Sequence, residues 1–404
     1  MTKQTNHFDV IIAGGGLSGC LTALALSKLT LPQASKLNIA IIEANEVLSN
    51  TALTFDSRVL ALSHGSVDYL KNLQVWQGIA TKAAPIETIH ISDKGFYGKA
   101  RVYAKDHGVD ALGHVIEMSV LGDALVEQVK QQNNVTWFTP DTISTIDWHK
   151  DHVNVTLASA QTISANLLVA CDGGQSKCRE LANIASDSKD YQQTAVIANL
   201  SMQTPHQNIA YERFTQHGPF AMLPLPENKT SSTKCSMVWT LPPDKAAEVM
   251  ALSDDAFKQA ITQSFGSWLG KVDIVGQRAA YPLILLRAKE QIFHRTVLVG
   301  NASHTIHPIA GQGFNLGLRD VKVLVEQIAR QIKAQQDYGT LASLMAYSEQ
   351  RAKDHNTVIG ITDSLVTLFS NTLPPLVIGR NIGLKVMNYC PSLKNAFVNK
   401  TMGY

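Results

Sequence analysis

The sequence predicts an α/β fold in which a buried parallel sheet is combined with an antiparallel sheet. The first observation is a set of short apolar runs rich in β-branched residues, typical of strands buried on both faces of a parallel sheet, at 8–13, 38–42, 166–171 and 295–299. The second is that glycine-rich turns follow three of these runs and helical patterns follow the turns. The third is that residues 186–280 contain alternating runs, which favour an antiparallel sheet.

The composition excludes several classes of protein. The chain has 404 residues with 45% hydrophobic residues, enough for a large core in two domains or in one α/β body with an insertion. Lys and Arg number 35 against 33 Asp and Glu, so the chain lacks the basic excess of a nucleic-acid binder. Its 5 cysteines form no C-x-x-C pair, which fits a reducing compartment. We expect a cytoplasmic protein without a nucleic-acid partner.

The charged fraction is 17%, below the roughly 25% of an average soluble protein. Such a shortfall indicates either large buried surfaces or an apolar partner. No apolar run reaches the roughly 18 residues of a membrane span.

The first glycine motif has the order strand, glycines, helix, strand and acid. The run 8–13 leads into a G-x-G-x-x-G at Gly14, Gly16 and Gly19. In this motif Gly14 permits the tight turn, Gly16 lets a pyrophosphate approach the backbone, and Gly19 allows helix and strand to pack closely. The next strand ends at Glu43, whose carboxylate would accept hydrogen bonds from a ribose. The motif predicts a dinucleotide, with NAD and FAD both open at this point.

Two further glycine-containing segments follow predicted strands. One begins with Asp172 and Gly173, a dipeptide that by itself indicates only a turn. The other covers 300–320 and leads into a helix with one apolar face. A glycine-rich loop in that position directs the free N–H groups of a helix N-terminus towards an electron-rich ligand.

In this order and spacing, the three segments resemble those of the FAD-dependent aromatic monooxygenases with the para-hydroxybenzoate hydroxylase fold. The signature D-G-x-x-S-x-x-R is matched at Asp172, Gly173, Ser176 and Arg179. The signature G-D-A-x-H-x-x-x-P-x-x-G-Q-G-x-N-x-G-x-x-D is matched at Gly300, Ala302, His304, Pro308, Gly311, Gln312, Gly313, Asn315, Gly317 and Asp320. The chain departs from it at Asn301, where the family has an Asp that contacts a ribityl hydroxyl. Because an amide also donates and accepts hydrogen bonds, we expect FAD binding to be retained.

The resemblance narrows to the ubiquinone-biosynthesis hydroxylases, and within them to the branch that acts on a polyprenyl methoxyphenol. It is carried by the stretches 55–62, 212–219, 307–315, 361–365 and 379–384. It implies that a flavin hydroperoxide formed from reduced FAD and O2 transfers one oxygen atom to the phenol ring. The reductant is NAD(P)H or another electron donor, and no second G-x-G-x-x-G indicates a separate nicotinamide domain.

The resemblance also implies a set of site residues. Arg58 lies near the flavin or its phosphates, and the flavin-proximal candidates are Pro308, His307 and His217, none of them assigned as catalytic. The residues expected to bind the cofactor are Gly14, Gly16, Gly19, Glu43, Arg58, Asp172, Gly173, Asn301, Gly311, Gln312, Gly313 and Asn315. His304 and His307 stand three apart on a loop without a carboxylate at ligand spacing, so no metal site is expected.

The motifs divide the chain into interleaved domains. We expect a Rossmann-like FAD-binding domain from 1–75, 100–185 and 280–345, an antiparallel-sheet substrate domain from 76–99 and 186–279, and a C-terminal helical region at 346–404. The apolar C-terminal stretch is interpreted in two ways. It forms buried helices of the FAD body, or it forms an apolar tunnel or a contact with the inner-membrane surface for a polyprenyl tail. Other ubiquinone-biosynthesis proteins are further candidate partners.

Three alternatives stay open from the residues alone. The enzyme hydroxylates a different ring position in the same pathway, or it is another FAD oxidoreductase of the same fold, such as a prenyl reductase. A non-catalytic subunit that keeps the fold is the third alternative, which the glycines retained in all three motifs oppose. A halogenase is disfavoured because the 5 tryptophans form no W-x-W-x-I-P motif.

Overall fold

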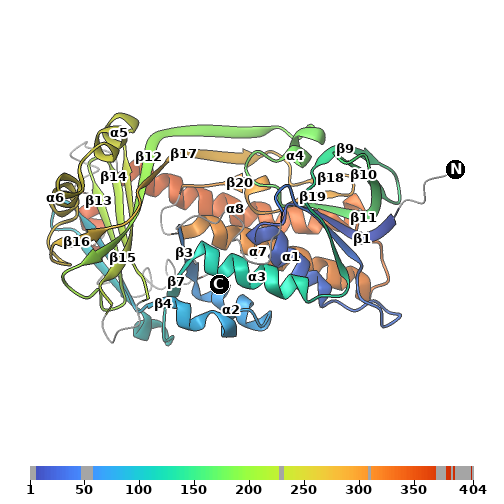
Figure 1. Ribbon diagram of the computed structural model, residues 1–404, viewed down its shortest axis with the longest axis horizontal. Coiled ribbons are helices and arrows are strands. Elements are labelled where there is room, and N and C mark those ends of the chain that lie inside the picture. Colours follow the sequence, from blue (N-terminus) through green and yellow to red (C-terminus); the bar gives the residue numbers. More distant parts are fainter. Residues whose placement is uncertain are drawn as a thin grey trace.

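The structure is a computed structural model that describes residues 6–46, 58–226, 232–307, 311–369, 379–383, 385–386 and 402. The molecule is elongated, with one large sheet at each end and a layer of helices between them (Figure 1). The predicted α/β class, with a Rossmann-like body, an interleaved antiparallel sheet and a helical C-terminal region, is confirmed.

The N-terminal strand lies at the centre of an 8-stranded sheet. Parallel pairing joins β1 to β11 and β2, β2 to β8, and β11 to β19. The strands of this sheet are β1 (Asn6–Ala13), β2 (Ile39–Ile42), β8 (Val135–Phe138), β9 (Ile143–Trp148), β10 (Val153–Leu157), β11 (Thr162–Ala170), β18 (Ile292–Phe293) and β19 (Thr296–Leu298). All four predicted apolar runs are therefore strands of one sheet, as continuous burial on both faces requires.

Helices cover one face of this sheet. Side chains of β1 alternate between two cores, since Val10 and Ile12 pack towards the helices while Ile11 and Ala13 pack towards β9 and β10. The helices of the body are α1 (Leu17–Ser27), α2 (His64–Asn72), α3 (Met118–Lys130), α4 (Lys177–Leu181), α7 (Gln312–Lys333) and α8 (Leu341–Phe369). Short 3-10 helices are η1 (Trp76–Gly78), η2 (Ala80–Lys82), η3 (Ala104–His107) and η4 (Gly300–Ala302).

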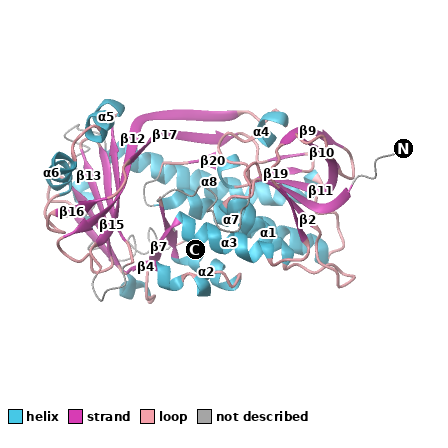
Figure 2. Ribbon diagram, viewed as in Figure 1, coloured by secondary structure: helices cyan, strands magenta, loops and turns pink. Residues whose placement is uncertain are grey.

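A 9-stranded sheet, mostly antiparallel, stands at the other end of the molecule (Figure 2). Its strands are β5 (Thr88–Asp93), β6 (Lys99–Tyr103), β12 (Ser186–Met202), β13 (Ile209–Thr215), β14 (Gly218–Pro224), β15 (Lys234–Leu241), β16 (Val272–Val275), β17 (Ala279–Ala288) and β20 (His304–Thr305). The strands β6 and β17 begin next to two of the predicted domain boundaries and pair within this sheet. One face is covered by α5 (Pro243–Met250) and α6 (Asp254–Phe265) around a core that includes Phe220 and Trp239.

A 3-stranded sheet lies against the opposite face of the 9-stranded sheet. It consists of β3 (Val59–Ser63), β4 (Ala83–Ile86) and β7 (Gly113–Glu117), in the order β3-β7-β4. Val115 of β7 shares an apolar cluster with Ala210 of β13. This small sheet was not predicted from the sequence, and it connects the two large sheets.

Most of the described residues of the C-terminal region are helical. After α8, residues 379–383 form a further helical segment that packs on the β5–β6 hairpin through Arg380 and Asn381. Among the described residues, no helix is both long and apolar enough to cross a membrane.

Candidate functional site

The first glycine motif forms a tight turn between β1 and α1. Gly14 has a φ of +93°, and a Cβ at this position would collide with the carbonyl oxygen of Cys171. A Cβ on Gly19 would collide with the carbonyl oxygen of Gly14, so helix and strand are in close contact here. At Gly16 a Cβ would meet nothing within 4 Å. The turn thus has one glycine whose surface is open, at the N-terminus of α1, where a phosphate group can reach the backbone.

Glu43 lies at the end of β2, beside this turn. One of its carboxylate oxygens accepts a hydrogen bond from the backbone N–H of Gly15 at 2.7 Å, and the other accepts one from the N–H of Asn45 at 3.0 Å. The side chain is 9% exposed. The carboxylate therefore holds the glycine turn against β2. The oxygen bonded to Asn45 also accepts from the Asn45 side-chain amide at 3.1 Å, so the oxygen bonded to Gly15 is the one that keeps a further lone pair for a ligand hydroxyl.

The second motif contributes a carboxylate, that of Asp172, with one oxygen that lacks a hydrogen-bond partner in the described structure. A Cβ on Gly14 of the first motif would lie 3.1 Å from the Cα of Asp172. Asp172 Oδ2 accepts a hydrogen bond from the N–H of Cys178 at 3.0 Å, while its Oδ1 is buried without a hydrogen-bond partner in the described structure. Arg179 donates to the carbonyl oxygens of Gly174 and Ala302, both at 2.8 Å. This arginine joins the second motif to the third, a role that the sequence alone did not show.

The third motif meets the first at Gly300. A Cβ on Gly300 would lie 2.8 Å from Ser18 Oγ in the first turn of α1, and its φ is +61°. Its N–H donates to Asp320 Oδ2 at 3.0 Å. The side chain of the next residue, Asn301, is exposed. The amide that replaces the expected aspartate is therefore available to a ligand.

Asp320 is the centre of a buried network. His304 Nε2 donates to its Oδ2 at 2.9 Å, and two α8 side chains, Arg351 at 2.6 Å and His355 at 2.8 Å, donate to Oδ1. Burial by itself would raise the pKa of Asp320, but His355, His304 and Arg351 lower it well below its usual value. Periodicity in α8 did not reveal Arg351 and His355, because it reports which face is apolar and not which buried polar groups meet.

His304, Asp320 and His355 offer atoms that lie within 4.8 Å of one another, as metal ligands do. The guanidinium of Arg351 binds the same carboxylate, however, and a second cation beside it would be repelled. In this network the Arg351 guanidinium is the cation that pairs with Asp320. The predicted absence of a metal site stays a prediction.

The loop before α7 is held by Asn315. Its amide oxygen accepts hydrogen bonds from the N–H of Ser63 at 2.9 Å and from Ser66 Oγ at 2.7 Å, while its amide nitrogen donates to the carbonyl oxygens of Ala61 and Gly311. Asn315 thus fixes Gly311 and the first turn of α7 against β3. Gln312 is buried and Gly313 is half-buried in the first turn of α7, and Gly311 caps the helix with a φ of 62°.

Two of the flavin-proximal candidates, His307 and His217, are linked through Gln193 of β12. His307 is buried and bonds through Nε2 to Gln193 Oε1 at 3.3 Å, and Gln193 Nε2 donates to the carbonyl oxygen of His217 at 3.1 Å. Burial lowers the pKa of His307 to about 4, so its ring is neutral at neutral pH and is a weak base. Arg58 lies over the ring of Tyr281 at 5.0 Å. Pro308 lies outside the described residues.

The residues present fit a dinucleotide. Backbone at Gly16 and Gly173 is open, because a Cβ at either position would meet nothing within 4 Å. The unsatisfied Asp172 Oδ1 and the exposed Asn301 amide add hydrogen-bonding groups around the same glycines. These groups come from all three motifs, and we call them the cofactor cradle. Arg179 and Gly300 bring the three motifs into contact.

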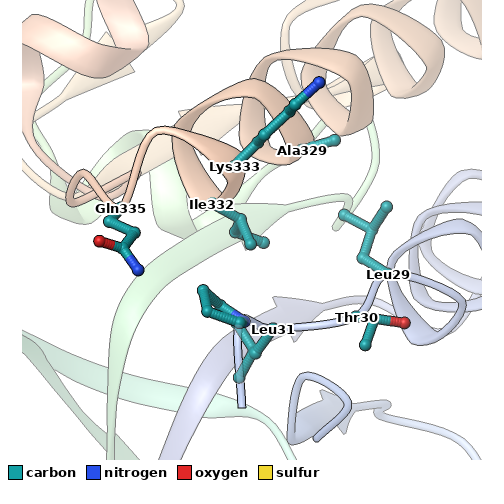
Figure 3. Close-up of a pocket in the computed structure, with 8 residues that line it drawn as sticks. Leu29, Thr30, Leu31, Ala329, Ile332, Lys333 and Gln335 are labelled. Atoms are coloured by element: carbon teal, nitrogen blue, oxygen red, sulfur yellow. The ribbon is translucent and has the colours of Figure 1, made fainter. Parts of the chain in front are cut away.

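A cavity of about 330 Å³ lies elsewhere, between the end of α1 and the end of α7 (Figure 3). It is lined by Leu29, Leu31, Ile332 and Lys333 among others. None of the predicted site residues line it, so we do not assign it to the cofactor site.

Known proteins resemble this chain over nearly its whole length. A family model described as the FAD binding domain matches residues 7–359. The ubiquinone hydroxylase UbiL of Rhodospirillum rubrum is 33% identical over 395 residues, covering 98% of this chain and 89% of that protein. The human mitochondrial ubiquinone biosynthesis monooxygenase COQ6 is 27% identical, with 97% and 92% covered.

Solved structures show the same fold. The p-nitrophenol 4-monooxygenase PnpA of Pseudomonas putida matches with a TM-score of 0.78 and 17% identity, and 99% of each chain is covered. PqsL of Pseudomonas aeruginosa, described as a probable FAD-dependent monooxygenase, matches with a TM-score of 0.73 and 17% identity, covering 94% of this chain and 100% of that one. The cofactor cradle and the match over 7–359 agree: the chain belongs to the FAD binding domain family and is a flavoprotein monooxygenase.

Proposed function

We propose that this protein hydroxylates the ring of a polyprenyl methoxyphenol in ubiquinone biosynthesis, using FAD, O2 and an external reductant. The observation that carries the proposal is the likeness to ubiquinone hydroxylases over almost the entire chain, in a protein whose three glycine motifs converge on one cradle. The reductant is NAD(P)H or another electron donor.

The chain's own residues have three tasks in this reaction. Gly16, Asp172 and Asn301 hold the cofactor by backbone and side-chain hydrogen bonds. FAD supplies the transfer of one oxygen atom from O2 to an electron-rich ring when it is bound and reduced. The 9-stranded sheet binds and orients the phenol and excludes water from the reacting atoms. His307 and His217, linked through Gln193, are the flavin-proximal residues, and Arg58 contributes a cation beside Tyr281.

We keep the division into a FAD body, a substrate sheet and a C-terminal helical region as a proposal. The body comprises the pieces 1–75, 100–185 and 280–345, and the sheet comprises 76–99 and 186–279. We make one change to these bounds: because β6 and β17 pair in the 9-stranded sheet, we move 100–103 and 280–288 from the body to the substrate sheet. The C-terminal region is 346–404.

The proposal is tested by deleting the gene and identifying the quinone precursor that accumulates. We expect a 2-polyprenyl-6-methoxyphenol, restored to ubiquinone by the wild-type gene but not by one encoding Gly16→Ala. A demethoxy-quinone would assign the enzyme to a different ring position. A normal ubiquinone level, together with saturated prenyl chains as products of the purified protein, would instead favour a prenyl reductase.

We further propose that the protein is cytoplasmic and contacts the inner membrane peripherally through a patch at the β5–β6 hairpin. Of 8 exposed large hydrophobic side chains in the described structure, four belong to this patch: Phe96 (46%), Tyr97 (58%), Ile382 (50%) and Val386 (39%). Lys385 lies over the Tyr97 ring at 4.5 Å, which joins the hairpin to the C-terminal segment.

The charges around the patch complement an anionic lipid surface. Residues 94–105 contain four basic residues and no acidic one, and 379–386 contain two basic residues and no acidic one. Aromatic side chains bordered by lysines are typical of contact with the lipid headgroup region. The apolar C-terminal stretch, much of which lies outside the described residues, is the part of the chain that we propose to contact the prenyl tail of the substrate.

Vesicle flotation tests this contact. Vesicles that contain phosphatidylglycerol should carry the wild-type protein, while the double variant Phe96→Ser/Tyr97→Ser should remain unbound. The matched control is Leu341→Ser/Met345→Ser, which removes two exposed apolar side chains from α8. Equal flotation of all three proteins would exclude this patch, and association with another protein of the pathway would then be the partner to test.

A further inference from the structure

On one face of the 9-stranded sheet, the acidic side chain of Glu212 lies in the middle of an apolar row. On β13, Tyr211 and Arg213 point to the face covered by α6. There the Tyr211 ring and the Arg213 guanidinium both contact the ring of Trp268. Strand alternation therefore directs Glu212 to the opposite face, which looks towards the FAD body.

The sheet register identifies the neighbours of Glu212. It is paired with Ile91 on β5 and Ala221 on β14, and Ala221 is paired in turn with Val238 on β15. Directly paired residues point to the same face. These side chains are all half-buried, whereas the corresponding row on the other face, which includes Phe220 and Met222, is fully buried against α5 and α6.

The FAD body contacts β13 at two places, one on each side of Glu212. Two residues before it, Ala210 packs in a cluster with Val115 of the 3-stranded sheet. Two residues after it, Phe214 packs in a cluster with Leu368 of α8. The FAD body therefore touches β13 on either side of Glu212, and the half-buried row lies between these supports.

The carboxylate has no partner among the described residues, and its surroundings are apolar. Burial raises the pKa of Glu212 to about 7, although the side chain keeps accessible surface. Glu212 is therefore enclosed by the protein and still partly accessible. The charged groups that face the same side are already paired or stacked: Asp93 binds Arg380 at 2.8 Å, and Arg58 lies over Tyr281.

We propose that Glu212 binds the hydroxyl group of the phenol substrate and accepts its proton. The O–H bond of the phenol breaks, its electron pair stays on the phenolate oxygen, and the proton moves to a carboxylate oxygen of Glu212. The ring becomes richer in electrons at the positions that receive oxygen, and the apolar row of Ile91, Ala221 and Val238 packs against the rest of the substrate. This inference rests on the proposed function.

The test measures binding of 2-methoxyphenol to the FAD-loaded protein by calorimetry, from about pH 5.5 to about pH 8.5. For the wild type, affinity should increase as the pH rises through about 7, because the carboxylate must be ionised to accept the proton. Glu212→Gln should bind about tenfold to a hundredfold more weakly, without this pH dependence. Glu212→Asp, which keeps an ionisable group, should recover the pH dependence.

A near-ultraviolet difference spectrum provides the second readout, since a phenolate band should form on binding to the wild type and not to Glu212→Gln. The matched control is Glu248→Gln on α5, on the other side of the sheet, which should behave as the wild type. Unchanged FAD absorbance and melting temperature show that the variants fold. If Glu212→Gln and the wild type bind 2-methoxyphenol alike, Glu212 has no such role and the proposed function stands. If the wild type binds no phenol, both are overturned.

Discussion

The backbone N–H of Gly300 donates a hydrogen bond to Asp320 Oδ2 at 3.0 Å, and this bond holds the turn that presents Asn301. The partners are 20 positions apart, with the turn at the end of β19 and the carboxylate on α7. Arg351 and His355 approach Asp320 from α8 and keep it ionised. The geometry of the cofactor turn therefore depends on a helix that does not itself belong to any of the three glycine motifs.

Asp320→Asn should destabilise the protein by about 3–5 kcal/mol, because it leaves the buried Arg351 guanidinium without its ionised partner. FAD affinity should fall as well, since the Gly300 turn loses its charged acceptor. Urea denaturation and FAD titration measure the two effects. The control is Asp255→Asn at an exposed position of α6, expected to change stability by less than about 0.5 kcal/mol. Equal stability of the two variants would contradict the role given to the network.

Alanine at two glycines of the first motif should separate folding from cofactor binding. Gly19→Ala forces a Cβ onto the carbonyl oxygen of Gly14, so we expect a loss of folded protein. Gly16→Ala meets no atom within 4 Å, and the variant should fold while its FAD content drops, since the Cβ occupies the approach of the phosphates. Melting curves and FAD-to-protein ratios distinguish these outcomes. Gly78→Ala, also without neighbours within 4 Å, is the control and should retain both properties.

Removing the Arg380 guanidinium should release the C-terminal segment from the β5–β6 hairpin. Arg380 and Asn381 both bond to the buried Asp93 carboxylate, which Arg380→Met would leave without its ion pair. We expect faster hydrogen exchange in 94–98 and 379–383, with a loss of about 3–5 kcal/mol. The double variant Asp93→Asn/Arg380→Met should recover part of that loss. Lys353→Met, at an exposed position of α8, should leave exchange in both stretches unchanged, and the idea fails if it has the same effect as Arg380→Met.

Stability should decrease as the pH falls from about 6.5 to about 4. Burial lowers the pKa of His114 to about 4, with Lys71 and His64 adding to the effect, and burial also lowers the pKa of His90 and His307 to about 4. In this window the unfolded chain binds protons at these three histidines that the folded chain does not. They outweigh the one proton that the raised pKa of Glu212 lets the folded chain bind, so acid favours unfolding. Urea denaturation at several pH values should give a shallower slope for His114→Gln, while the exposed control His149→Gln should keep the wild-type slope.

Much of the cofactor cradle was predictable because its physical demands act on neighbouring residues. The close contact of Gly19 with Gly14 and the open backbone at Gly16 follow from spacing within a single turn. The sequence predicted less where one residue type can either bind the cofactor or bond to another part of the folded chain. The motif that predicts Asn315 as a cofactor-binding residue did not show that its amide joins β3 to the start of α7, where four donors and acceptors of the folded chain surround it.

The sequence by itself determined that the chain folds as an α/β flavoprotein, since apolar strand runs, glycine turns and their order are local properties. Only the tertiary structure decided which distant groups meet. Asp93 and Arg380 are 287 positions apart, and Glu212 gains its significance from strands and helices that close around it on both sides. The periodicity of the sequence does not predict contacts between residues so far apart in the chain. Hydrogen bonds and desolvation depend on distances in space, and these are set when the two sheets and α8 pack together.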